Sequence, residues 1–120
     1  MKVSISKSNY IYVPECMGNP ELPEAEQVII EHTLMTAEQE EKFSTMYLRR
    51  EGKDDFGMTV KTHAVEIWDA CVTKVTNIED MDGKPITDPK AVREIPGIYE
   101  MVTEVAAVIK RGLTEADSKN

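Results

Sequence analysis

Residues 60–75 read VKTHAVEIWDACVTKV, and this stretch contains the most regular apolar pattern of the chain. Its apolar side chains recur at positions i, i+4, i+7, i+8, i+11, i+12 and i+15: Val60, Ala64, Ile67, Trp68, Cys71, Val72 and Val75. Such spacing predicts one continuous amphipathic helix. Trp68 lies at the centre of the apolar stripe, so we expect it to anchor the core.

Two further helices are predicted after this stretch. Asp82-Gly83, within 77–86, suits a tight turn, and Pro85 restricts pairing, so a short edge hairpin is expected there. Asp88-Pro89 is typical of a helix start, and that helix should end before Pro96-Gly97. An amphipathic helix then ends at Lys110-Arg111-Gly112. Its apolar stripe is Ile98, Met101, Val102, Val105, Ala106 and Ile109.

Before residue 60, the pattern changes from strand to helix. Apolar residues alternate with other side chains in 3–13, where Ile11 and Val13 share one face, and again in 26–34. These runs predict an antiparallel strand pair joined by a long loop. Thr36 and Gln39 then have the spacing of a capping box, which predicts a helix. Its apolar stripe would be Phe43, Met46 and Tyr47.

The expected fold is therefore α+β and mainly α: an N-terminal strand pair, three to four amphipathic helices and a short edge hairpin near 77–86. A length of 120 residues fits one domain. We divide it into a strand pair and loop (1–35), a helical part (36–112) and a short C-terminal turn or tail (113–120).

The charge balance restricts the partners. Fourteen basic and 22 acidic side chains give a net charge of −8, which repels phosphate backbones, so nucleic-acid binding is not expected. No apolar run approaches the roughly 20 residues of a membrane span. The N-terminus lacks the apolar stretch of a secretion signal. Cys16 and Cys71 do not form a CxxC motif or any repeated cysteine pattern. These features favour a cytoplasmic protein with reduced thiols.

No group of residues predicts catalysis, a cofactor or a metal site. Asp80-Met-Asp82-Gly83 resembles part of a calcium loop, but its first and twelfth positions would be Ile78 and Pro89, which supply no side-chain oxygen.

The histidines and cysteines give no site either. His32 and His63 lack ligands at zinc spacing. Cys71 lies within the apolar stripe and should be a small buried hydrophobe, whereas Cys16 should be exposed and reactive. An enzyme is therefore not expected. The stripe Phe43, Met46 and Tyr47 is our predicted partner-binding surface, with core filling as the alternative.

The order of segments resembles a known family, the small tail assembly chaperones of long-tailed bacteriophages and their prophages. The likeness begins with YVPECMGN (12–19) and LPEAEQ (22–27), which is followed by a strand. It continues through the helix bearing Trp68 and NIEDMDGKPI (77–86) to a further helix and the ending LTEADSKN.

The resemblance implies a non-enzymatic role without cofactors in the cytoplasm of the bacterial host. Such proteins bind the tape measure protein and aid polymerisation of the tail tube protein around it. The alternative is a head–tail joining or tail-completion protein that stays in the virion. Self-association is left open.

Overall fold

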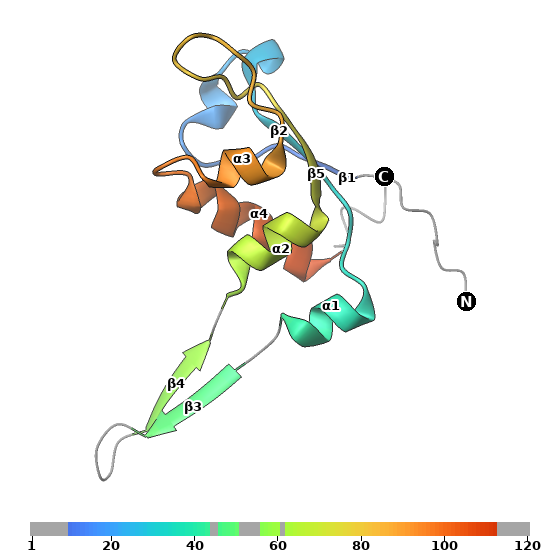
Figure 1. The fold of residues 1–120 in the computed structure, drawn as a ribbon, viewed down its shortest axis with the longest axis vertical. Coiled ribbons are helices and arrows are strands. Elements are labelled where there is room, and N and C mark those ends of the chain that lie inside the picture. The colour runs from blue at the N-terminus through green and yellow to red at the C-terminus, as the bar shows by residue number, and fades with distance from the viewer. Residues whose placement is uncertain (1–9, 44–45, 51–55, 61, 113–120) are drawn as a thin grey trace, which may run out of the picture.

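The computed structural model describes residues 10–43, 46–50, 56–60 and 62–112. They form an α+β fold, as predicted, with five strands, four α-helices and two short 3-10 turns in the described residues (Figure 1). The strands are β1 (Tyr10–Tyr12), β2 (Ile29–His32), β3 (Met46–Arg50), β4 (Phe56–Val60) and β5 (Val72–Thr76). The helices are α1 (Ala37–Lys42), α2 (Ala64–Cys71), α3 (Pro89–Arg93) and α4 (Tyr99–Arg111), and the 3-10 turns are η1 (Asn19–Glu21) and η2 (Glu24–Glu26).

A three-stranded antiparallel sheet has the order β1-β2-β5. The predicted pairing of the two N-terminal strands is confirmed for the described residues: Tyr12 lies opposite Ile30 and Tyr10 opposite His32. Residues 3–9 of the first predicted strand lie outside the described residues. Ile30 is fully buried, and Tyr12 packs against the core. Ile11, one position away, is 68% exposed because successive side chains of a strand point to opposite faces.

The predicted helix over residues 60–75 is wrong at both ends. Val60 belongs to β4, and α2 begins only after His63. His63 has a φ of 53°, a left-handed conformation that cannot continue a right-handed helix. The helix ends at Cys71, and Val-Thr-Lys-Val-Thr forms β5, as its β-branched residues favour.

A β-bulge explains why β5 has helix-like spacing in the sequence. Glu31 pairs with Lys74 but His32 pairs with Val72, so Thr73 is the extra residue on β5. Its hydroxyl donates to the Glu31 carbonyl at 3.1 Å. Val72 and Val75 are consequently both buried although they are three residues apart, a spacing that also occurs on one helix face.

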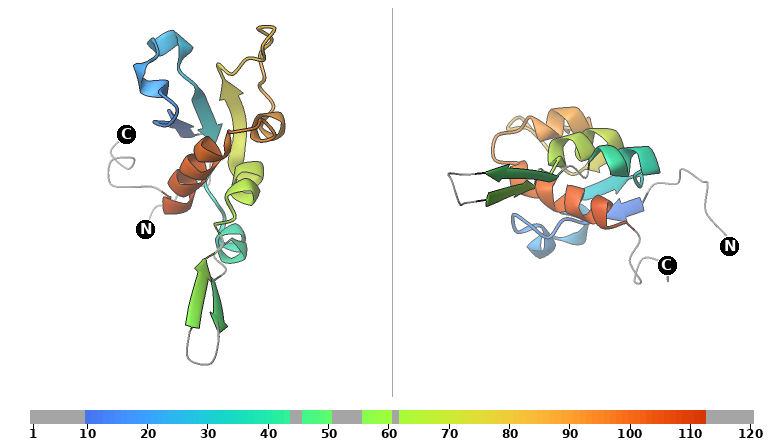
Figure 2. Two further views of the ribbon diagram at one scale, coloured as in Figure 1. Left: turned by 90° about the vertical axis from the view of Figure 1, so that its left-hand side faces the viewer. Right: turned by 90° about the horizontal axis from the view of Figure 1, so that it is seen from below.

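The helices and the sheet share one core. α4 packs on α2, and α3 contacts both α2 and β5 (Figures 1 and 2). The side chain of Trp68 is fully buried, and its Nε1 donates to the carbonyl oxygen of Pro89 at 2.8 Å. The other core residues of the described chain are Val28, Ile30, Phe43, Ala64, Ile67, Cys71, Val72, Val75, Val92, Ile98, Met101, Val102, Val105, Ala106 and Ile109.

The helix predicted after Thr36 is shorter than expected. Its capping box is confirmed, because Thr36 Oγ1 accepts from the Gln39 N–H and the Gln39 side chain accepts from the Thr36 N–H. The helix ends at Lys42, and Met46 and Tyr47 belong to strand β3. β3 and β4 form a two-stranded antiparallel hairpin that extends away from the remaining elements (Figure 1). The part predicted as helical, 36–112, thus also contains strands β3 to β5.

The predicted boundaries of the last two helices are confirmed. The Asp88 side chain accepts from the Lys90 N–H with Pro89 in the first turn, and α4 ends at Gly112 with a φ of 74°. Between β5 and α3, Glu79 and Pro85 form an isolated bridge around the Asp82-Gly83 turn. The predicted tail, 113–120, lies outside the described residues.

Substituting Trp68 separates its packing from its hydrogen bond. Trp68→Phe keeps an aromatic ring but leaves the Pro89 carbonyl without its donor, so we expect a loss of about 1 to 3 kcal/mol in unfolding free energy. Trp68→Ala also leaves a cavity in the core, so its unfolding free energy should fall by about 3 to 5 kcal/mol. Urea unfolding followed by circular dichroism measures both. Equal stability of the two variants would contradict the packing role of the ring.

Candidate functional site

The structure does not place the predicted partner-binding residues on one helix face. Phe43 follows the last residue of α1 and is buried, with its ring centroid 5.7 Å from that of His63. Met46 and Tyr47 lie in β3, opposite Val60 and Thr59. The shared helical stripe is therefore wrong, because the helix ends at Lys42, before all three of its members. A partner-binding role for these residues stays a prediction.

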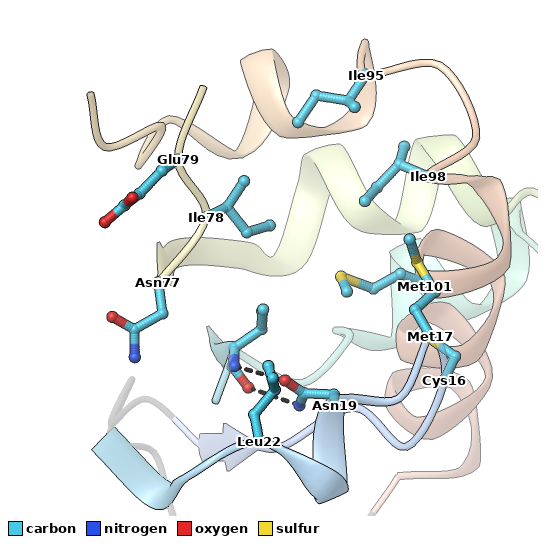
Figure 3. A pocket seen from close by; sticks show the side chains of 11 residues that line it. Cys16, Met17, Asn19, Leu22, Asn77, Ile78, Glu79, Ile95, Ile98 and Met101 are labelled. Carbon is cyan, nitrogen blue, oxygen red and sulfur yellow. Dashed lines mark hydrogen bonds between the residues drawn. The ribbon is translucent and has the colours of Figure 1, made fainter. Parts of the chain in front are cut away.

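A pocket of about 340 Å³ lies elsewhere, between the loop after β1, the loop after β5 and the start of α4 (Figure 3). Its walls are mainly apolar. Figure 3 shows Ile78, Ile95, Ile98 and Met101 around a common space, with Met17 and Leu22 at the facing loop. The remaining lining residues are Cys16, Asn19, Val28, Asn77 and Glu79.

Asn19 holds the first of these loops together. The residue is only 2% exposed, and its Nδ2 donates to the carbonyls of Pro14 and Val28 at 2.8 and 3.2 Å. Its Oδ1 accepts from the Val28 N–H at 2.7 Å. Both ends of the 14–28 loop are thereby tied to one buried amide, which satisfies backbone groups that the loop cannot pair itself.

A second amide, Asn77, links the two loops that form the pocket walls. Its Nδ2 donates to the carbonyls of Ala25 and Gln27 at 2.9 and 2.8 Å. The Gln27 side chain in turn donates to the carbonyls of Pro20 and Leu22. Asn77 has a φ of 70°, a conformation that asparagine tolerates better than most residues. The loop after β5 is thus fixed against the loop after β1.

Glu104 of α4 fixes the same loop from the other side. Its Oε2 accepts from the Tyr12 hydroxyl at 2.5 Å and from the Glu15 N–H at 2.7 Å, and its Oε1 accepts from the Cys16 N–H at 3.0 Å. Burial is the largest influence and by itself raises the pKa of the Glu104 carboxyl. The hydrogen bonds from Tyr12, Glu15 and Cys16 outweigh burial and hold that pKa below its ordinary value.

The pocket is rimmed by exposed apolar side chains. Met17 is 59% exposed and Leu22 is 42% exposed. Met17 also has a φ of 56°, which is unusual for a residue other than glycine, and Gly18 follows it in the same region at 71°. Residues with such backbone conformations cluster at ligand-binding sites, and this one lies at the edge of an apolar pocket.

The surroundings of both cysteines favour the protonated thiol. Burial, followed by the hydrogen bond to Glu104 and its charge, raises the pKa of the Cys16 thiol to about 11. The expectation of an exposed, reactive Cys16 is therefore wrong, because the loop folds onto α4. Cys71 is buried in the core as predicted, and burial raises the pKa of its thiol too.

The histidines serve local structure. His32 is buried, its Nδ1 lies 2.8 Å from the Thr33 carbonyl oxygen, and its ring stacks on Tyr10. The Nδ1 of His63 lies 2.9 Å from Glu66 Oε1.

The Asp80 side chain stabilises its own turn, because it accepts hydrogen bonds from the N–H groups of Asp82 and Lys84. Among the described residues, no group of three His, Cys, Asp or Glu side chains could hold a metal ion.

Comparison with known proteins identifies no relative: no family model, no curated protein and no solved structure matches the chain significantly. None of the helices in the described part of the chain has the length and apolarity required to cross a membrane.

Substitutions at Asn77 test the link between the two loops. Asn77→Gly keeps the positive φ but loses both hydrogen bonds, so we expect a loss of about 1 to 2 kcal/mol. Asn77→Ala loses the bonds and adds backbone strain of about 1 kcal/mol more. Urea unfolding measures stability, and a glutamate-specific protease should cleave at Glu24 and Glu26 faster in both variants. Unchanged cleavage would contradict the link.

Glu104 gives the stability a defined pH dependence. Because the pKa of its carboxyl is lower in the folded than in the unfolded chain, the ionised side chain stabilises the fold above its unfolded pKa of about 4.3. This contribution is lost as the pH falls through the lower folded pKa. Glu104→Gln should therefore lose about 1 to 2 kcal/mol at pH 7 and much less at pH 3. A difference independent of pH would contradict the ionic role.

Proposed function

We propose that this chain is a non-catalytic protein-binding domain that acts as a tail assembly chaperone of a long-tailed bacteriophage or prophage. One observation carries the proposal. The segments 12–19 and 22–27 carry much of the sequence resemblance together with 77–86, which lies far from them in the chain. All three contribute residues to one apolar pocket (Figure 3).

The physical properties of the site suit protein binding. The pocket is bounded by Met17 and Leu22, which expose apolar surface to water, and its walls are fixed by Asn19, Asn77 and Glu104. A preformed apolar site loses little conformational entropy on binding. The net charge of −8 keeps such a protein soluble while apolar surface stays open.

In this role the chain acts in the cytoplasm of the bacterial host and binds the tape measure protein. A long helical chain with apolar faces aggregates unless those faces are covered. The chaperone covers them while the tail tube protein polymerises around the tape measure, and it leaves before the particle is complete. A head–tail joining or tail-completion protein would instead stay in the virion.

Coexpression with the tape measure protein of the same genome tests the proposal. We expect the two chains to copurify and the soluble fraction of the tape measure to rise several-fold. Mass spectrometry of purified virions should then lack this chain. Its presence in virions at stoichiometric amounts, with no effect on tape measure solubility, would favour the joining or completion role and reject the chaperone.

A further inference from the structure

We propose that the pocket between the 14–28 loop, the 77–83 loop and the start of α4 is a docking site for a positively charged amphipathic segment of the partner protein. An apolar side chain of that segment fills the pocket, and its basic residues contact the acidic residues beside it. The inference rests on the proposed protein-binding function and assigns the chemistry of the bound segment.

The interior of the pocket suits an apolar side chain. Ile78, Ile95, Ile98 and Met101 form its walls, and about 340 Å³ is at the small end for a ligand site. The amide of Asn19 is already bonded to backbone groups at both its oxygen and its nitrogen. The buried wall therefore offers shape and apolar contact, and methionine side chains can adapt to the group that enters.

The segments that form the pocket are rich in acidic residues. Residues 13–28, 77–83 and 94–101 contain no lysine or arginine. They contain nine acidic residues: Glu15, Glu21, Glu24, Glu26, Glu79, Asp80, Asp82, Glu94 and Glu100. Glu79 is the one that lines the pocket, and Glu94 is paired with Arg93. Glu26 and Glu79 also line an adjoining hollow of about 300 Å³ together with Leu22 and Asn77. Glu79 at the pocket and Glu26 at the adjoining hollow thus supply two carboxylates beside the apolar space that a bound segment would fill.

This charge selects among the occupants that an apolar pocket could take. A second copy of the chain would bring another net charge of −8 against these acidic residues. Anionic ligands and phosphate backbones would be repelled for the same reason. A segment with lysine or arginine beside an apolar residue satisfies both the interior and these carboxylates, and it would associate faster at low salt.

Two apolar and two acidic positions allow matched tests. Met17 and Leu22 are exposed at the pocket, and Val65 on α2 is comparably exposed but does not line it. Met17→Ser with Leu22→Ser therefore removes the apolar rim, with Val65→Ser as its control. Glu26→Lys with Glu79→Lys reverses two acidic charges at the pocket and the adjoining hollow. Glu38→Lys with Glu41→Lys on α1 is its control, because it changes the net charge by the same amount. Circular dichroism and thermal unfolding establish that each variant is folded.

Labelled peptides of about 20 residues, long enough to form a helix, provide the probes. The three peptides have their charged residues at the same positions. The first has a leucine stripe and lysines, the second has the same leucine stripe with glutamates in place of the lysines, and the third keeps the lysines but has serines in place of the leucines. Fluorescence anisotropy should show the leucine–lysine peptide binding the full chain at least about tenfold tighter than the other two. Each double variant at the pocket should weaken it about tenfold, and the controls less than about twofold.

Three results would overturn the docking site: equal binding of the leucine–glutamate peptide, equal binding of the serine–lysine peptide, or equal weakening by the control variants. The proposed function fails separately. Pocket variants that copurify with the tape measure at wild-type yield reject the docking site alone. A wild-type chain that binds the leucine–lysine peptide at the pocket but not the tape measure supports the docking site and rejects the chaperone.

Discussion

The burial of Trp68 is the constraint on which the rest of the fold depends. Its indole is enclosed on all sides, and its one polar atom is satisfied by the Pro89 carbonyl. This bond fixes the start of α3 against α2. The connection 77–88, which leads from β5 to α3, must therefore end beside Trp68. The same packing places α4 across α2, which brings Ile98 and Met101 opposite the loop after β1.

Two side-chain amides and one carboxylate hold the 14–28 and 77–83 loops in fixed positions at the pocket. Asn19 and Asn77 pair backbone groups that irregular loops leave open, and Glu104 ties the first loop to α4. These bonds fix the walls of the pocket, and the apolar side chains of Met17 and Leu22 are exposed at its rim. The acidic residues of the same loops are the basis of the preference for cationic partners that we propose.

Features with local causes could be predicted from the sequence. The capping box at Thr36, the Asp88-Pro89 start and the Gly112 end depend on neighbouring residues, and all three were found. The structure differs from the sequence prediction where strand pairing, rather than the local sequence, decides the secondary structure. The bulge at Thr73 gives a strand the spacing of a helix, and strand pairing with β4 takes Met46 and Tyr47 out of the α1 helix. The pocket joins residues more than 50 apart through Asn77, which no local pattern reveals.

Methyl NMR of the methionines in the full chain tests the central claim, that this pocket is where the partner binds. Met17 and Met101 line the pocket, whereas Met35 precedes α1 and packs against the core away from the pocket lining. On addition of a soluble fragment of the tape measure protein, the account predicts that the Met17 and Met101 signals shift or broaden while the Met35 signal stays. Binding that leaves Met17 and Met101 unchanged would contradict it.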